Sequence, residues 1–191
     1  MSAPSIQAIA IGASAGAVQA LLRILPALPA TYPLAVLIVV HLPSDRGNPL
    51  VSLFQPKCLL PVREAEDKEP IRPGVVYFAP SDYHLLVESN LSLALSMDEP
   101  VNHSRPAIDV LLETAADAYG PALVGIVLTG ANHDGAAGLR AVSDAGGVAI
   151  VQEPAEAQVP AMPKAALAAC PSARPMTLND LISYLLKLAT T

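Results

Sequence analysis

The chain has little that would link it to a metal, a disulfide framework or a nucleic acid. It contains only two cysteines, Cys58 and Cys170, and neither has a second Cys or His at metal-ligand spacing, so we expect both to be packing residues. Only 11 of its 191 residues are basic, they are scattered, and the net charge is −6. Without a basic stripe there is no electrostatic footprint for DNA or RNA. We expect no metal, no cofactor and no nucleic-acid partner.

A long apolar run and a secretory leader are also missing. The longest clean apolar run, Leu34 to Val40, is far shorter than the ~20 residues that cross a bilayer. The first residues, Met1 to Ser5, lack the basic start and apolar stretch of a secretory signal. We therefore expect a cytoplasmic protein without membrane insertion. Because 191 residues, 52% of them apolar, suit one sizeable core, we expect a single domain over residues 1–191.

Short apolar segments that alternate with helical patterns make up most of the chain. We expect strands at Ile6 to Ile11, Leu34 to Val40, Leu123 to Leu128 and Gly147 to Val151. We expect helices after the first strand and at Ala107 to Tyr119, Gly135 to Ala145 and Thr177 to Leu188, the last with Thr177 as N-cap. Apolar strands separated by helices are typical of a parallel sheet covered on both faces. The prediction is an α/β fold, doubly wound and mostly parallel.

The middle of the chain departs from this alternation of strands and helices. Four short strand-like pieces, punctuated by Pro, Gly and Asn, cover Val62 to Glu66, Val75 to Ala79, Leu85 to Glu88 and Leu91 to Leu95. Such pieces are typical of hairpins. We therefore expect an antiparallel hairpin elaboration on one side of the sheet.

A Gly-x-Ser-x-Gly motif, Gly12 to Gly16, lies between the first strand and the first helical pattern. Small neighbours in this position permit a sharp turn that exposes the hydroxyl of Ser14. The N–H groups that open the helix, that of Ala15 among them, would then face an oxyanion forming beside Ser14. Because serine is also a common helix N-cap, the motif alone leaves a nucleophile and a capping residue as alternatives.

Two more polar residues follow strands. His41 ends the second predicted strand, and Asp134 comes soon after the third. Because ligands bind open parallel sheets at the carboxyl ends of the strands, Ser14, His41 and Asp134 can converge as nucleophile, base and orienting carboxylate. Taken singly, His41 is also explained as a histidine at the edge of the core and Asp134 as an N-cap. His133 is a second, weaker candidate for the base.

Four segments of the chain, in order, are AIGASAGAVQALLRIL, VVHLPS, EPVNHSRPAIDVLLETAA and GIVLTGANHDGAAGL. They resemble the signature segments of the chemotaxis receptor methylesterases (CheB type), and the resemblance covers nearly the whole chain. In that family the matching serine, histidine and aspartate form the catalytic triad, which implies these roles for Ser14, His41 and Asp134. The resemblance also implies hydrolysis of γ-methyl esters of glutamate on chemoreceptors, and deamidation of glutamine there.

The same resemblance implies partners. They are a methylated chemoreceptor or related signalling protein, and a separate receiver or methyltransferase, since the chain starts at the first strand of the catalytic domain and we expect no receiver domain of its own. Arg105, in the family's Arg-Pro segment, is a candidate for contact with an acidic receptor surface, because a guanidinium pairs well with carboxylates. A solvated Arg105 in a capping loop is an equally good interpretation.

Two positions of the expected site depart from the family pattern. The family usually has Thr where Ala15 stands and Met where Ala131 stands. We name both as candidates for the oxyanion pocket. The main rival hypothesis is therefore a binding or adaptor domain whose site is weakened at these alanines.

Two other protein classes share the first motif. An α/β-hydrolase has the same turn, but its triad runs Ser, acid, His along the chain, which would require a pair such as Asp109 and His133. A dinucleotide-binding domain needs Gly where Ser14 stands and an acidic residue where His41 stands. The order Ser, His, Asp favours the serine hydrolase over both.

Overall fold

The computed structural model describes residues 5–42 and 49–190, and these contain a seven-stranded sheet in the order β3-β4-β2-β1-β7-β8-β9, parallel throughout. Its strands are β1 (Ala8–Ala13), β2 (Ala35–Val40), β3 (Val62–Glu64), β4 (Val76–Phe78), β7 (Leu123–Val127), β8 (Val148–Gln152) and β9 (Arg174–Met176). A separate antiparallel pair consists of β5 (His84–Val87) and β6 (Leu93–Ser96). Residues Met1 to Pro4 and the Pro43-Ser44 end of the segment VVHLPS lie outside the described residues.

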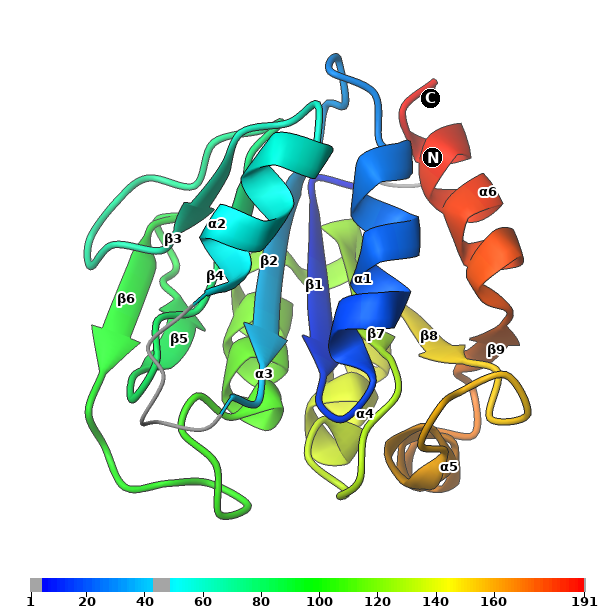
Figure 1. The fold of residues 1–191 in the computed structure, drawn as a ribbon. Helices are drawn as coiled ribbons and strands as arrows, with labels where there is room; N and C mark the ends of the chain where they lie inside the picture. Colours follow the sequence, from blue (N-terminus) through cyan, green and yellow to red (C-terminus); the bar gives the residue numbers. More distant parts are fainter. Residues whose placement is uncertain (1–4, 43–48, 191) are drawn as a thin grey trace.

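Helices cover both faces of the sheet (Figure 1). On one face lie α1 (Ala17–Ile24), α2 (Leu50–Phe54) and α6 (Leu178–Leu188), and on the other α3 (Ile108–Tyr119), α4 (Ala136–Asp144) and α5 (Ala161–Ala169). Short 3₁₀ turns occur at η1 (Leu25–Ala27), η3 (Gln55–Lys57) and η4 (Gly120–Ala122). Within residues 5–42 and 49–190, no helix combines the length and the apolar character needed to cross a membrane.

The central strand β1 divides its side chains between two cores. Ile9, Ile11 and Ala13 pack on the α1 and α6 side, whereas Ala8 and Ala10 face the side of α3. All six residues of β1 are buried, which explains why the strand is apolar without alternation. The residues that face α3 are small, so that helix lies close to the strand. At Gly12 a Cβ atom would overlap the side chain of Ile108, the first residue of α3.

The predicted fold class is confirmed, and the four long strands lie within two residues of their predicted bounds. The hairpin prediction is correct for β5 and β6 and wrong for the two earlier pieces. Strands β3 and β4 pair with each other in parallel and extend the main sheet next to β2. The reason is that residues 65–75, which connect them, pass along β6: the N–H of Lys68 donates to the carbonyl of Leu93 at 2.9 Å, and that of Leu93 to Glu69 at 2.9 Å.

Gly12→Ala is expected to lower the free energy of unfolding by about 1–3 kcal/mol, because the new methyl group overfills the space that Ile108 occupies. Urea denaturation measures the loss. Ile108→Ala removes the atoms that the methyl group meets, so the double variant should lose less stability than the sum of the two single variants. Additive losses would mean that the strand and the helix do not meet at these two residues.

Candidate active site

Ser14 is the first residue after β1, on the turn that leads into α1. Its N–H donates to the carbonyl of Thr129 at 2.9 Å, and its own carbonyl accepts the N–H of Ala17 at 2.9 Å. Gly16 follows at φ +85°, a conformation that glycine adopts without strain, and it is the N-cap of α1. Because α1 has no side-chain cap, the capping alternative for Ser14 is wrong. The Ser14 hydroxyl makes no hydrogen bond within residues 5–42 and 49–190.

The sheet places His41 beside Ser14. Ala13 and Val40 are partners in the pairing of β1 with β2, and the N–H of His41 donates to the carbonyl of Ala13 at 3.2 Å. Neighbouring strands lie about 4.8 Å apart, so residues one position beyond a pair remain neighbours. Side chains alternate between faces, and Gly12 and Val39 both face α3. Ser14 lies two residues after Gly12, and His41 two residues after Val39. Both are therefore directed to the same face, the side of α3.

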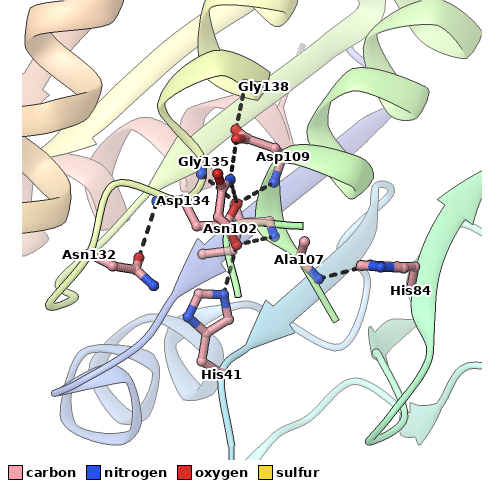
Figure 2. A network of polar contacts seen from close by, with 10 residues as sticks. His41, His84, Asn102, Ala107, Asp109, Asn132, Asp134, Gly135 and Gly138 are labelled. Atoms are coloured by element: carbon pink, nitrogen blue, oxygen red, sulfur yellow. Dashed lines mark hydrogen bonds and ion pairs between the residues drawn. The ribbon is translucent and has the colours of Figure 1, made fainter. Parts of the chain in front are cut away.

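His41 is hydrogen-bonded to Asp134 (Figure 2). The distance between His41 Nε2 and Asp134 Oδ2 is 2.8 Å, and the two side chains are 13% and 0% exposed. An imidazole that donates its Nε2–H to a carboxylate keeps Nδ1 unprotonated. Nδ1 is thus the nitrogen that keeps a lone pair for accepting a proton, and its role as the base for Ser14 stays a prediction. The structure brings His41 and Asp134 into contact, and it places Ser14 next to them without a hydrogen bond.

Asp134 is fully buried, and both of its oxygens accept several hydrogen bonds. Besides His41, the donors are the backbone N–H groups of Ile108 (2.6 Å), Asp109 (3.0 Å) and Gly135 (3.0 Å) and the side-chain amide of Asn102 (2.9 Å). Burial acts to raise the pKa of Asp134, but the hydrogen bonds, that of His41 first, outweigh burial and hold the pKa below its ordinary value. The site therefore contains an ionised and firmly oriented carboxylate.

The two rival roles for His133 do not agree with the structure. His133 is exposed and makes no side-chain hydrogen bond in the described part of the chain. Asp109, its partner in an α/β-hydrolase arrangement, accepts the N–H of Gly138 at 2.7 Å and the amide of Asn102 at 2.7 Å. His41 is thus the histidine that meets the buried carboxylate, and the triad in the order Ser, His, Asp stays a prediction.

The oxyanion candidates lie on the two loops around Ser14. Ala15 is the next residue on the turn, and Ala131 lies after β7, the neighbour of β1 in the sheet. Both residues are exposed, and neither N–H donates a hydrogen bond within the described residues. Two unengaged backbone N–H groups beside a serine are what an oxyanion hole needs. Their role stays a prediction.

Arg105 lies beside His41, at a cavity of about 250 Å³. Both residues line it, together with Asp82, Pro100 and His103 among others. The Nη1 group of Arg105 donates to the carbonyls of Met97 at 3.0 Å and Asp98 at 3.1 Å, which ties the loop after β6 to the site. The guanidinium thus has a structural contact, and Arg105 also lines the cavity that His41 lines.

Comparison with known proteins identifies the family to which this site and fold correspond. The sequence model described as CheB methylesterase matches residues 9–185 of the chain.

The chain belongs to the CheB methylesterase family. A Leptospira interrogans relative, which bears the name protein-glutamate methylesterase/protein-glutamine glutaminase as a provisional assignment, is 44% identical over 85% of this chain and 84% of its own. A Chromohalobacter salexigens protein of the same name is 36% identical over 97% of this chain, and the chain spans about half of it, 53%. The catalytic domain of Thermotoga maritima CheB methylesterase has a TM-score of 0.89 at 30% identity, over 97% of this chain and 100% of that one.

In this CheB-family chain, Thr129 holds the turn that carries Ser14, a role that the sequence analysis missed. Its hydroxyl donates to the carbonyl of Ala15 at 2.8 Å and accepts the N–H of Val159 at 2.9 Å. Its carbonyl accepts the N–H of Ser14, and its N–H donates to the side chain of Gln152 at 2.9 Å. The only signal in the sequence is a polar residue directly after a buried strand. Its partners lie 114, 30 and 23 residues away, so nothing local identifies them.

Thr129→Val is expected to slow the reaction of Ser14 with a fluorophosphonate probe by about ten- to a hundredfold. The valine keeps the shape of the side chain, but it releases the carbonyl of Ala15 and shifts the turn. Labelling rates followed by intact-protein mass spectrometry give the comparison. Thr114→Val is the matched control, because it removes a hydroxyl that joins α3 to β5 at 3.1 Å, away from Ser14. Equal labelling of both variants and wild type would contradict the role of Thr129.

Asp134→Asn is expected to lower the free energy of unfolding by about 3 kcal/mol near pH 6, because an amide cannot accept all the N–H groups that the carboxylate accepts. The pKa of Asp134 is lowered in the folded chain, so its stabilisation is full above the ordinary value of 3.8 and is lost as the pH falls through the folded pKa. Urea denaturation from pH 6 to pH 3 should show the difference between wild type and variant shrinking below that value.

For Asp109→Asn we expect the stability difference from wild type to change with pH in the opposite direction. Burial raises the pKa of Asp109, and the hydrogen bond from Gly138 offsets only part of this effect. Its charge is therefore costly at neutral pH, and wild type should gain stability relative to this variant as acid protonates Asp109. If both variants showed the same pH trend, the opposite pKa shifts of the two aspartates would be wrong.

Proposed function

We propose that the chain is a serine hydrolase that removes γ-methyl esters from glutamate residues of chemoreceptor-type proteins, and that it also deamidates glutamine there. The observation that supports the proposal is the hydrogen bond from His41 to Asp134, which leaves Nδ1 of the histidine able to accept a proton, on the strand next to the one that leads to Ser14. Relatives named protein-glutamate methylesterase/protein-glutamine glutaminase support this substrate class.

The mechanism follows from the three side chains. Ser14 Oγ attacks the ester carbonyl while His41 Nδ1 takes its proton. His41 then gives that proton to the departing methanol, and in the same way to ammonia when the substrate is glutamine. Asp134 keeps the imidazole in the required tautomer and stabilises its charged form. Water, activated by His41, hydrolyses the acyl-enzyme and releases the glutamate carboxylate. The N–H groups of Ala15 and Ala131 stabilise the oxyanion.

The partners follow from the same reasoning. We propose that Arg105 and the cavity it shares with His41 contact the acidic surroundings of the methylated glutamate, with a methylated chemoreceptor or related signalling protein as the substrate. A receiver domain or the methyltransferase is the proposed regulator in the same complex, and the cytoplasm the proposed compartment. Residues 1–191 are proposed to act as one catalytic domain, since the first strand, β1, and the last, β9, belong to the same sheet.

The test is methanol release from a methylated receptor signalling helix. Wild type should release methanol, and Ser14→Ala should reduce the rate to background while it keeps the fold, because the nucleophile is absent. Ser183→Ala is the matched control, since within the described residues that hydroxyl bonds only the carbonyl of Asn179, at 2.9 Å on α6. Unchanged release by Ser14→Ala would remove the serine mechanism. No release by folded wild type that binds the receptor would instead favour an adaptor domain.

A further inference from the structure

Neither α3 nor α4 caps its own N-terminus. The N-cap of α3 is Ala107 and that of α4 is Gly135, and no side-chain cap accompanies either. The first N–H groups of a helix need acceptors, and when they are buried the acceptors must come from the protein. Each helix therefore depends on a side chain from elsewhere in the chain.

The two helices obtain these acceptors from each other (Figure 2). Asp134, which precedes α4, accepts the N–H groups of Ile108 and Asp109 at the start of α3. Asp109, in the first turn of α3, accepts the N–H of Gly138 in α4 at 2.7 Å. The exchange places two buried carboxylates close to each other, each at the positive end of a helix dipole.

Asn102 joins the two carboxylates. Its Nδ2 lies 2.7 Å from Asp109 Oδ2 and 2.9 Å from Asp134 Oδ1, so each of its two N–H bonds has one acceptor. Asn102 has φ +51°, a region in which asparagine is tolerated better than most residues. The bond to Asp134 goes to the oxygen that does not contact His41, since His41 is bonded to Oδ2.

We propose that Asn102 is a positioning residue for the reaction: by binding Oδ1 of Asp134 and the neighbouring carboxylate of Asp109 at once, it keeps Oδ2 directed at His41. This inference rests on the proposed function only for its kinetic consequence. Without the amide, the two like charges lose the one side chain that donates to both of them, and Asp134 can turn away from the imidazole. His41 then loses the partner that holds Nδ1 towards Ser14.

The start of α3 has another support, so the loss of Asn102 should not unfold it. The Nδ1 atom of the buried His84 accepts the N–H of Ala107 at 3.2 Å, and its Nε2 donates to the carbonyl of Glu99 at 3.0 Å. These bonds fix the residue before α3 to β5 and to the preceding loop. A variant at Asn102 therefore acts on the carboxylates while the helix start stays anchored.

Two variants distinguish the effect of losing the N–H donors of Asn102 from the effect of losing its side-chain volume. Asn102→Asp keeps the shape and replaces the donor with a third carboxylate, and Asn102→Gly removes the side chain at a positive φ that glycine accepts without strain. We expect kcat for ester hydrolysis to fall about tenfold or more in both, with KM within about threefold of wild type, because only the orientation of the base changes. Asn90→Asp is the control, since this side chain accepts the N–H and the hydroxyl of Ser92 on the β5–β6 turn, through an oxygen that aspartate also has.

The second readout is the proton NMR resonance of His41 Nε2–H, which does not depend on any substrate. In wild type it should be resolved far downfield and exchange slowly, and in Asn102→Asp and Asn102→Gly it should broaden or move upfield. Thermal unfolding identifies a variant that has simply lost its fold, and the other variant then decides.

Wild type without esterase activity but with this resonance, lost in the variants, would support the positioning role and remove the proposed function. Variants that keep both the resonance and a kcat within about twofold of wild type would overturn the positioning role.

Discussion

The site depends on one constraint, which is that the ionised carboxylate of Asp134 is fully buried. A charge removed from water is tolerated only when nearly every lone pair has a donor, and losing donors costs several kcal/mol. Here the donors come from the start of α3, from the residue after Asp134 itself, from Asn102 and from His41. The same hydrogen bonds that make the burial tolerable thereby fix the position of α3 and the direction in which the imidazole points.

Close packing makes this arrangement sterically possible. Gly12 lets α3 approach β1, because a Cβ there would overlap Ile108, and Gly138 lets α4 approach α3, because a Cβ there would come within 3.0 Å of the backbone of Asp109. The strand order supplies the rest, since β1 lies between β2 and β7. The loops that follow these three parallel strands lie at one end of the sheet (Figure 1). By their positions in the chain, Ser14, His41 and Asp134 lie directly after or shortly after these strands.

Features with a local sequence signature could be predicted, and features that depend on contacts between distant segments could not. A local signature marks the strand before Ser14, the strand that ends at His41 and the loop that carries Asp134. Parallel topology then implies that these three segments end close together. Three other features have no local signature in the sequence. They are the exchange of acceptors between Asp109 and Asp134, the support of Ala15 by Thr129, and the pairing of β3 and β4 within the main sheet. These features depend on contacts between segments far apart in the chain. A short apolar piece bounded by turns does not itself distinguish a hairpin strand from a parallel edge strand.

The same dependence on backbone contacts applies to Ala15 and Ala131, where the sequence resemblance implies the larger Thr and Met. An oxyanion hole made of backbone N–H groups depends on the direction of the peptide planes and not on what the side chains contribute. The plane that carries the Ala15 N–H also contains the Ser14 carbonyl, which accepts the N–H of Ala17 at 2.9 Å, a contact that requires nothing of the Ala15 side chain. A smaller side chain at either position changes the shape of the surroundings of Ser14 and does not itself change the direction of that plane. The two alanines are thus an argument for a different fit of the substrate, and a weak argument for the loss of catalysis.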